Sequence, residues 1–545
     1  MRETFVDIVR EQADVRGDET WLRYLETGDV AGTVTEVTYG TLEERARAIA
    51  VEILRHCRPG DRALLMYPSG VEFVTAFVGC WFAGVIPVPA YPPDLARPAR
   101  SLAKIHAIAA DCGARIALTT SEILPIFARI APPEIKPVAT DTCRDSDAWG
   151  PPAITGTTTA LLQYTSGSTG SPKGVVVSHA NLLANERSIE AAMGPVKLVV
   201  GWLPIFHDMG LLGNVLQALH AGTGLVLMSP VSFLKRPARW LEAISHYKAT
   251  TSGAPNFAFD LCVRRVTDQE RQRLDLRSWE VACCGAEPVR AATYRRFLDR
   301  FEPVGFSRTA FYPCFGLAEA TLFVTGNRRD TPVTTTRFAA TSLEHGQVRV
   351  TDSDDDARTL VSCGVPAPSE QVRIVDPDRC VPTEGVGEIW VRGPGVANGY
   401  WGRDASETFA ARLADGDGPY LRTGDLGFLY GGELYVTGRS KDMIIIGGRN
   451  LFPQDIESAI EGAVPAVRKG CCAAFSVDEQ GEERLCIMAE HDGAPDTENA
   501  IKRVVAEQFQ VAVFDVALVA KGELPKTSSG KLERHACRRA HRRTT

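Results

Sequence analysis

The stretch Tyr164-Thr165-Ser166-Gly167-Ser168-Thr169-Gly170-Ser171-Pro172-Lys173-Gly174 lies between two apolar, β-like runs, Thr157–Thr165 and Val175–Val177. Its glycines let the backbone approach an anion closely, and its hydroxyl groups and lysine can donate to phosphate oxygens. It is not a Walker A loop, because no Gly-Lys-Ser or Gly-Lys-Thr opens a helix. The alternative is a mobile Ser/Gly linker, but linkers are not normally clamped between two apolar strands. The stretch therefore predicts a phosphate-binding loop.

Around this loop, apolar β-rich runs alternate with amphipathic helical ones. A strand is predicted at Arg62–Tyr67, a helix at Glu72–Ala83 and a strand at Val85–Pro89. The same order returns with a strand at Gly224–Met228 and a helix at Pro237–Ser245. This alternation predicts an α/β fold with layered, largely buried sheets.

Two other segments have the composition of loops. Asp141–Thr157 is rich in Asp, Pro and Gly, and Asn327–Pro366 contains the acidic run Asp352-Ser353-Asp354-Asp355-Asp356. Both are predicted to be irregular and exposed, since such residues favour turns.

Two uncharged stretches, Phe73–Ala90 and Met209–Leu234, are long enough to be compared with membrane spans. Each contains prolines, glycines or polar residues that a span would not tolerate well. Both are better explained as a buried helix, a turn and a buried strand, so we predict no membrane span. The N-terminus lacks the basic-then-apolar layout of a signal peptide, and the predicted location is cytoplasmic.

The composition is that of a globular protein. The chain has 545 residues, of which 44% are hydrophobic and 23% charged, and a formal net charge of −7. These values exclude a disordered, collagenous or purely coiled-coil protein, and the acidic balance argues against nucleic acid as a partner. The 14 cysteines form no Cys-x-x-Cys pair and are predicted to be reduced, buried thiols.

After Gly438 the pattern changes to short strands and helices. The predicted elements are a strand at Met443–Ile446, a helix from Pro453, strands at Cys471–Ser476 and Arg484–Glu490, a helix at Thr497–Phe509 and a strand at Asp515–Val519. Roughly a hundred residues of α+β structure can form a core of their own. We predict a hinge near Arg439–Lys441 and a mobile small domain beyond it.

Five ordered motifs resemble those of the adenylate-forming superfamily, which includes acyl-CoA synthetases, adenylation domains and luciferases. They are the loop above with its trailing Val-Val-Val-Ser-His, Cys314–Glu319, Thr423–Asp425, Gly438–Asp442 and Pro525–Lys531. The resemblance implies a large N-terminal AMP-binding domain, 1–438, made of layered α/β subdomains and a small β-barrel-like part. It also implies a small, mobile α+β lid, 439–545, that carries the catalytic lysine.

The resemblance implies that ATP and Mg²⁺ are the cofactors. It assigns nucleotide binding to Thr165, Ser166, Gly167, Ser168, Thr169, Gly170, Lys173, Gly285, Ala286, Glu287, Phe315, Gly316, Asp425 and Arg439. Phe315 is expected to stack on adenine, and Asp425 to accept from both ribose hydroxyls. Glu319, with Thr169, is expected to hold Mg²⁺, a hard cation that prefers oxygen ligands. Without the resemblance, Phe315 is explained as a core aromatic, Glu319 as an exposed helix residue and Thr423–Asp425 as an ordinary turn.

The resemblance also assigns roles to two residues of the predicted lid and its hinge. Lys531 is the expected catalytic lysine, able to move between the carboxylate and the α-phosphate, and Lys441 is the expected hinge. Lys526 competes for the catalytic role, but it is predicted to be a charge on the outer loop. The basic end of the chain, Lys531–Arg543, is either a solvated helix terminus or a surface that attracts an acidic carrier protein.

Several phrases resemble one branch in particular, the fatty acyl-AMP ligases. They are Trp202–Leu211, Ser229–Pro237, Ala254–Phe257, Gly285–Arg290, Ala318–Leu322 and an extra segment near 337–362. In that branch the insertion hinders the lid pose that forms a thioester with CoA. The resemblance therefore implies activation of a fatty or related carboxylic acid and transfer to a holo acyl carrier protein. Without the resemblance to that branch, the segment is interpreted as a surface insertion with an acidic turn.

His207 allows two interpretations. A histidine beside Asp208 can be a catalytic base or a gate. The attacking carboxylate is already ionised at pH 7 and needs no base. A role in the acid pocket, with Met209 and Gly210, is therefore favoured.

Two departures leave alternatives open. Gly447 stands where this branch usually has Arg, and Gly447-Gly448 is commoner in CoA ligases, so an acyl-CoA synthetase is the alternative function. Cys284 stands where Asn is usual. A non-catalytic acyl-nucleotide binder is a further alternative, although Glu319, Asp425 and Lys531 are all present.

Overall fold

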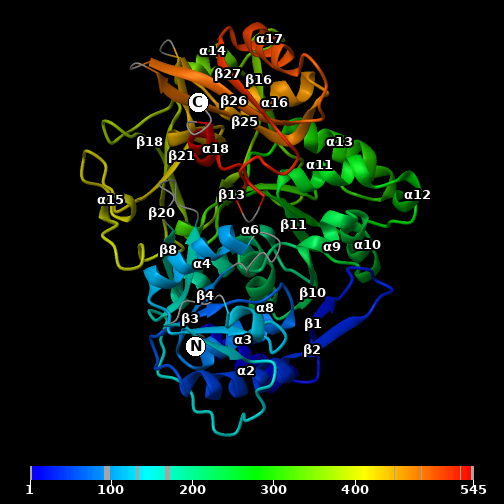
Figure 1. Cartoon of the computed structure of the whole chain (residues 1–545), viewed down its shortest axis with the longest axis vertical. Coiled ribbons are helices and arrows are strands. Elements are labelled where there is room, and N and C mark those ends of the chain that lie inside the picture. Colours follow the sequence, from blue (N-terminus) through cyan, green and yellow to red (C-terminus); the bar gives the residue numbers. More distant parts are fainter. Residues whose placement is uncertain are drawn as a thin grey trace.

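The protein is described from a computed structural model, in which residues 3–90, 98–129, 134–165, 172–446, 449–479, 482–527 and 530–541 are described. In Figure 1 the N-terminal elements, in blue and cyan, occupy one end of the molecule, and the C-terminal elements, in orange and red, occupy the other. Green and yellow segments lie between them. The fold is the mixed α/β structure that the sequence predicts.

A nine-stranded sheet forms the centre of the large domain. From β13 to β1 the neighbouring strands are parallel, whereas β2, β14 and β17 run antiparallel to their neighbours. All of β12 is buried, as expected for a parallel strand covered on both faces. The strands, in sheet order, are β17 (Val365–Pro366), β14 (Phe323–Gly326), β13 (Phe311–Gly316), β12 (Val281–Cys284), β11 (Thr251–Ala254), β9 (Leu198–Gly201), β10 (Gly224–Met228), β1 (Thr20–Leu25) and β2 (Val34–Thr38).

A second sheet and a hairpin lie in the N-terminal third. The sheet is parallel, in the order β4 (Ile86–Pro89), β3 (Arg62–Leu65), β5 (Ile116–Thr119) and β6 (Lys136–Ala139). The hairpin consists of β7 (Thr159–Thr165) and β8 (Lys173–Ser178). Helices cover these sheets: α1 (Phe5–Arg16), α2 (Tyr39–Leu54), α3 (Val71–Phe82), α4 (Pro98–Cys112), α5 (Leu124–Phe127) and α6 (His179–Met193).

Both uncharged stretches are buried helix and strand, as predicted. The first forms α3 and β4. The second forms α7 (Asp208–Gly210), a π-helix η1 (Leu211–Leu216), α8 (Gln217–Ala221), β10 and α9 (Pro230–Lys235). Among the described residues, no helix is long and apolar enough to cross a membrane. All 14 cysteines are free thiols.

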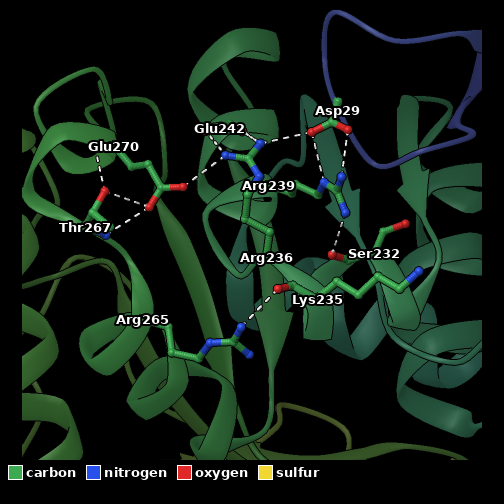
Figure 2. A network of polar contacts seen from close by, with 9 residues as sticks. All are labelled: Asp29, Ser232, Lys235, Arg236, Arg239, Glu242, Arg265, Thr267 and Glu270. Atoms are coloured by element: carbon green, nitrogen blue, oxygen red, sulfur yellow. Dashed lines mark hydrogen bonds and ion pairs between the residues drawn. The ribbon is translucent and has the colours of Figure 1, made fainter.

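The remaining helices of the large domain are α10 (Ala238–Tyr247), α11 (Asn256–Arg265), α12 (Asp268–Arg271), α13 (Ala291–Phe301), η2 (Glu302–Val304), η3 (Ala318–Ala320) and α15 (Ser406–Phe409). A network of ion pairs, shown in Figure 2, joins two of them, α10 and α12, to the loop after β1. Asp29 accepts from Arg236 at 3.0 Å and from Arg239 at 2.8 Å. Arg236 also pairs with Glu242 and Glu270. The network fixes α9, whose Phe233 ring stacks on Trp202 with 3.8 Å between ring centres.

A five-stranded antiparallel sheet follows and corresponds to the small β-barrel-like part. Its order is β19 (Val381–Pro382), β18 (Gln371–Asp376), β20 (Gly387–Arg392), β21 (Leu421–Tyr430) and β22 (Glu433–Arg439). The short helix η4 (Ser440–Asp442) comes directly after β22.

The prediction that Asn327–Pro366 is an irregular loop is wrong. The segment contains β15 (Thr335–Ala339), α14 (Ala340–Glu344) and β16 (Ala357–Val361), and β15 pairs antiparallel with β16. Phe338 and Leu343 are fully buried against Phe428 and Tyr435, and these apolar contacts hold the insertion in a defined fold. The acidic run lies at an exposed turn between the two strands, as predicted.

The C-terminal elements agree with the predicted pattern. They are β23 (Ile444–Ile446), β24 (Arg449–Leu451), α16 (Pro453–Ala463), β25 (Val467–Glu479), β26 (Glu482–His491), α17 (Thr497–Phe509), β27 (Val513–Val519) and α18 (Arg534–His541). Ile456 and Ile460 of α16 are fully buried with residues of β25, β26 and α17. These elements therefore share an apolar core.

Candidate active site

The predicted phosphate loop closes the hairpin of β7 and β8. Thr165 and Lys173 are paired across the two strands, so both stand where the loop leaves the hairpin. Ser166, Gly167, Ser168, Thr169 and Gly170 lie outside the described residues, and their predicted roles stay predictions. The Lys173 ammonium lies 4.8 Å from the centre of the Tyr400 ring.

Glu319 is carried by η3, directly after β13. The following turn is tightly built: Thr321 has a φ of 65°, which is unusual for a β-branched residue, and its hydroxyl donates to the Gly395 carbonyl at 2.6 Å. A Cβ on Gly316 would overlap the carbonyl oxygen of Leu322, so the turn requires glycine there. The Glu319 Oε1 atom accepts a 3.0 Å hydrogen bond from the Tyr400 hydroxyl.

The residues predicted to surround adenine leave the sheet at one edge. Gly285, Ala286 and Glu287 follow β12, and Phe315 and Gly316 end the adjacent parallel strand β13. Ligands bind beyond the carboxyl ends of parallel strands in open α/β sheets, which is where these segments meet.

Two local features shape this edge. A Cβ on Gly285 would lie 2.9 Å from the Cys314 sulfur, so the neighbouring strand requires glycine there. Glu287 accepts from the Phe257 backbone N–H at 2.6 Å. Burial raises the pKa of Glu287, and nearby cations, Lys531 among them, partly oppose the rise.

The predicted ribose motif lies on β21 beside β22. Asp425 is paired in register with Arg439, whose Nε donates to Asp425 Oδ1 at 3.0 Å. The Thr423 hydroxyl accepts from the Asp425 backbone N–H at 3.1 Å and holds the turn closed. Burial raises the pKa of Asp425, while Arg439, Lys441 and Lys531 oppose the rise.

A recess of about 290 Å³ opens next to this motif. It is lined by Glu388, Arg422, Thr423, Gly424, Arg439, Ser440 and Lys441. Lys441 lies in η4, and burial together with the Arg439 charge lowers its pKa. The recess therefore joins the ribose motif to the predicted hinge.

Glu388 is a residue of this site that the sequence analysis missed. Its Oε1 accepts from the Gly424 backbone N–H at 3.0 Å, and its Oε2 accepts from Arg422 at 2.9 Å. The side chain of Trp390 donates to the same Oε2 at 3.0 Å. The sequence did contain one indication of this role: Glu388 lies within the mostly apolar strand Gly387–Arg392. A buried carboxylate needs hydrogen-bond donors, so such a residue is expected to bind neighbouring groups.

His207, Met209 and Gly210 are brought together at the start of α7. A Cβ on Gly210 would overlap the Pro204 carbonyl oxygen, and the Met209 side chain packs toward Gly253 of β11. Burial lowers the pKa of His207 to about 4, and the Lys531 charge acts in the same direction. His207 is therefore neutral at pH 7, which agrees better with a pocket wall than with a charged gate.

Lys531 lies on a loop that folds back on itself. Its backbone N–H donates to the Thr527 hydroxyl at 3.0 Å, and its carbonyl accepts from the Thr527 N–H at 2.8 Å. The Lys531 charge lowers the pKa of His207, Glu287 and Asp425.

The alternative lysine is bound elsewhere. Lys526 Nζ donates to the Gly470 carbonyl at 2.7 Å and lies 3.3 Å from the Cys471 sulfur. Its ammonium is thus held against the C-terminal sheet. The charges of both lysines act on Glu287, but only that of Lys531 also acts on His207 and Asp425.

Comparison with known proteins identifies this arrangement. The profile of the family described as AMP-binding enzyme matches residues 9–401. The chain is also 41% identical to the medium-chain-fatty-acid–acyl-carrier-protein ligase JamA of Moorena producens, over 98% of this chain and 94% of JamA. The chain belongs to the AMP-binding enzyme family, in its fatty acyl-AMP ligase branch. In this ligase, residues 441–544 match a second profile, described as Disco-interacting protein 2-like, AMP domain.

Two further similarities cover nearly the whole ligase. It is 38% identical to the long-chain-fatty-acid–AMP ligase FadD26 of Mycobacterium tuberculosis, over 97% of the ligase and 96% of FadD26. It also resembles the crystal structure of a fatty acyl-adenylate ligase from Legionella pneumophila in complex with acyl adenylate and pyrophosphate. That similarity has a TM-score of 0.78 and 39% identity, and covers 99% of the ligase and 96% of the Legionella chain.

Proposed function

We propose that the ligase converts a fatty or related carboxylic acid and ATP into acyl-AMP and pyrophosphate. A carboxylate oxygen attacks the α-phosphorus, the bond from that phosphorus to the bridging oxygen of pyrophosphate breaks, and pyrophosphate leaves. In the second step the phosphopantetheine thiol of a holo acyl carrier protein attacks the acyl carbonyl. AMP leaves with the bonding electron pair, the thiol loses its proton, and a thioester forms.

The observation that carries this proposal is the electrostatic reach of Lys531. One ammonium from the C-terminal loop acts on His207 of the acid pocket, Glu287 of the adenine edge and Asp425 of the ribose motif. A cation whose charge acts on residues of all three subsites can stabilise the charge that develops as the carboxylate attacks the α-phosphate. Asp425 and Arg439 then orient the ribose, and Lys173 faces the phosphates.

Glu319 is suited to Mg²⁺. Its Oε1 is occupied by the Tyr400 hydroxyl, while among the described residues no hydrogen bond is made to Oε2. One free carboxylate oxygen is an appropriate protein ligand for a metal that keeps waters and binds phosphates. When bound, Mg²⁺ would supply positive charge that neutralises the phosphate oxygens.

The carrier protein is favoured over CoA by contacts between the insertion and the C-terminal elements. Arg449 donates to both carboxylate oxygens of Glu344, at 2.8 and 2.9 Å. Arg358 of β16 pairs with Asp455 of α16 at 3.0 Å and covers the Phe452 ring at 4.5 Å. These contacts hold the lid where Lys531 faces the site. They oppose the second lid pose, in which CoA ligases form the thioester with CoA.

The first test is ATP–pyrophosphate exchange with a panel of carboxylic acids of different chain length. Exchange with at least one fatty acid is expected, and no exchange with any acid would overturn the proposal. Acyl transfer is then compared between CoA and a holo carrier protein under equal conditions. Faster formation of acyl-CoA would show that CoA is the acceptor, and it would leave the proposed adenylation step unchanged.

An acyl-CoA synthetase remains the second candidate function because of Gly447-Gly448, which lies outside the described residues. The acceptor comparison decides between the two. For either acceptor we propose the cytosol as the compartment, because the reaction consumes ATP.

A further inference from the structure

Tyr400 contacts two residues that the proposed function assigns to different ligands. Its hydroxyl donates to Glu319, the candidate metal ligand, at 3.0 Å. Its ring faces the ammonium of Lys173, the lysine of the phosphate loop, at 4.8 Å. A tyrosine phenol carries its proton near pH 7, so the hydroxyl is the donor to the carboxylate. No motif in the sequence analysis included this residue.

The backbone around Tyr400 is fastened to both partners. The Asn398 N–H donates to the Val176 carbonyl at 2.9 Å, and the Trp401 N–H donates to the Gly174 carbonyl at 2.8 Å, so the segment runs along β8. The Ala397 N–H donates to the carbonyl of Glu319 itself at 2.9 Å. Residues 393–401 therefore connect the strand after the phosphate loop with the turn that carries Glu319.

Two asparagines, one turn apart on α6, form hydrogen bonds with both of the segments that are connected here. The Asn181 side chain donates to the carbonyls of Pro394 and Val396, both at 2.9 Å. The fully buried Asn185 donates to the Phe323 carbonyl at 3.0 Å and accepts from the Phe323 N–H at 3.2 Å. The two amides clamp the 393–396 segment and the 320–323 turn onto one helix.

We propose that Tyr400 is a positioning residue that prepares the metal and phosphate sites together. Its hydroxyl occupies one oxygen of Glu319 and directs the other toward Mg²⁺, while its ring holds the Lys173 ammonium near the phosphate loop. This inference rests on the proposed function, because it takes Glu319 as the metal ligand and Lys173 as the phosphate ligand. The inference adds that the Tyr400 side chain positions both Glu319 and Lys173.

The hydroxyl is tested by Tyr400→Phe, with equilibrium binding of ATP measured as Mg²⁺ is titrated, independently of turnover. The Mg²⁺ concentration for half-maximal binding should rise roughly tenfold, as for loss of a hydrogen bond to a charged group. ATP binding in the presence of a chelator should be unchanged. The matched control is Tyr435→Phe, which removes a hydroxyl bonded to Thr336 at 2.9 Å and should leave both values as they are.

The Glu319→Gln background separates positioning from a general structural effect. In that background Tyr400→Phe should cause no further rise, because the hydroxyl acts through the carboxylate. If Tyr400→Phe raised the Mg²⁺ concentration for half-maximal binding equally with and without Glu319, the positioning role would be overturned. An unchanged Mg²⁺ requirement in Tyr400→Phe alone would also overturn it.

The ring is tested by Tyr400→Leu, which should also weaken metal-free ATP binding about threefold through loss of the cation–π contact. If Tyr400→Leu does not fold, Tyr400→Met, which also removes the aromatic face, tests the same contact. Metal-free binding that is insensitive to these changes contradicts the role of the ring.

The outcomes for Tyr400 and for the proposed function are distinguishable. Wild-type protein that binds ATP and Mg²⁺ as described, but gives no pyrophosphate exchange with any acid, would refute the function and keep the positioning role. Normal exchange in the wild-type protein, together with an unaltered Mg²⁺ requirement in Tyr400→Phe, would refute the positioning role and keep the proposed function.

Discussion

Burial controls the protonation of the side chains that face Lys531. It lowers the pKa of His207 to about 4 and raises those of Glu287 and Asp425. The Lys531 ammonium opposes the rise at both carboxyl groups, so these groups stay better ionised when the lysine is present. At the scale of single residues, the charge of one lysine thus acts on a neutral imidazole and on two carboxyl groups.

Lys531→Ala should lower pyrophosphate exchange roughly a hundredfold or more, because a preorganised charge at the reacting centre is lost. Lys526→Ala is the matched control: its ammonium is bound to Gly470, and exchange should change about fivefold or less. A normal rate in Lys531→Ala would show that another residue carries the charge.

Two histidines, the buried His179 and the half-buried His207, make stability depend on pH. Burial lowers the pKa of both His179 and His207 to about 4, below the unfolded value of about 6.5. The unfolded state therefore binds more protons as the pH falls below 6.5. Between pH 7 and pH 5 the free energy of unfolding should decrease by about 1–2 kcal/mol for each histidine.

Urea denaturation at several pH values measures this decrease. His179→Asn should flatten the pH dependence between pH 7 and pH 5, even though it removes the Phe5 N–H contact and lowers stability overall. An unchanged slope in His179→Asn would contradict the buried, neutral state of this ring.

At the scale of elements, the ribose motif depends on pairing between strands. β21 carries Asp425, β22 carries Arg439, and β20 contributes Glu388, which holds the Gly424 turn from the neighbouring strand. The positions of these residues follow from strand register, which a one-residue shift would destroy by turning each side chain to the opposite face.

Glu388→Gln should raise the KM for ATP about tenfold and leave the KM for the acid unchanged, because the charge-assisted bond to Arg422 is lost. Glu433→Gln, at the half-exposed start of β22 in the same sheet, is the control. Steady-state kinetics with each substrate varied in turn measures both constants. A parallel rise of both KM values would indicate general damage instead of a displaced ribose turn.

At the scale of the whole molecule, the insertion and the C-terminal elements are joined by ion pairs far from the reacting atoms. Arg449–Glu344 and Arg358–Asp455 connect segments that are about 100 residues apart in the chain. Part-buried pairs of this kind bias the equilibrium between lid poses only to the extent that they exist in one pose and not in the other.

The double variant Glu344→Gln with Arg358→Gln should increase acyl-CoA formation about fivefold or more, because the pose that opposes CoA loses two contacts. Pyrophosphate exchange should fall little. Asp354→Asn, which removes the exposed partner of Arg337, is the control. Unchanged acyl-CoA formation in the double variant would show that these pairs do not select the acceptor.

Local patterns in the sequence determined the alternation of strands and helices, the order of the five motifs and most of the C-terminal elements. They also predicted Lys531, Glu319 and Asp425, because each belongs to a short contiguous motif. The β15–β16 pair was mistaken for a loop, since its strands are short and polar. The burial of Phe338 in β15 and Leu343 in α14 depends on contacts with the distant Phe428 and Tyr435.

Tertiary structure alone decided which distant residues act together. Tyr400 is 81 residues from Glu319, and Glu388 is 36 residues from Gly424, so no local periodicity connects either pair. Their contacts depend on the packing of strands and turns, which buries polar groups and obliges them to find partners. Phosphate binding by the loop was predicted from its residues, whereas the contacts of Tyr400 with Lys173 and Glu319 could not be.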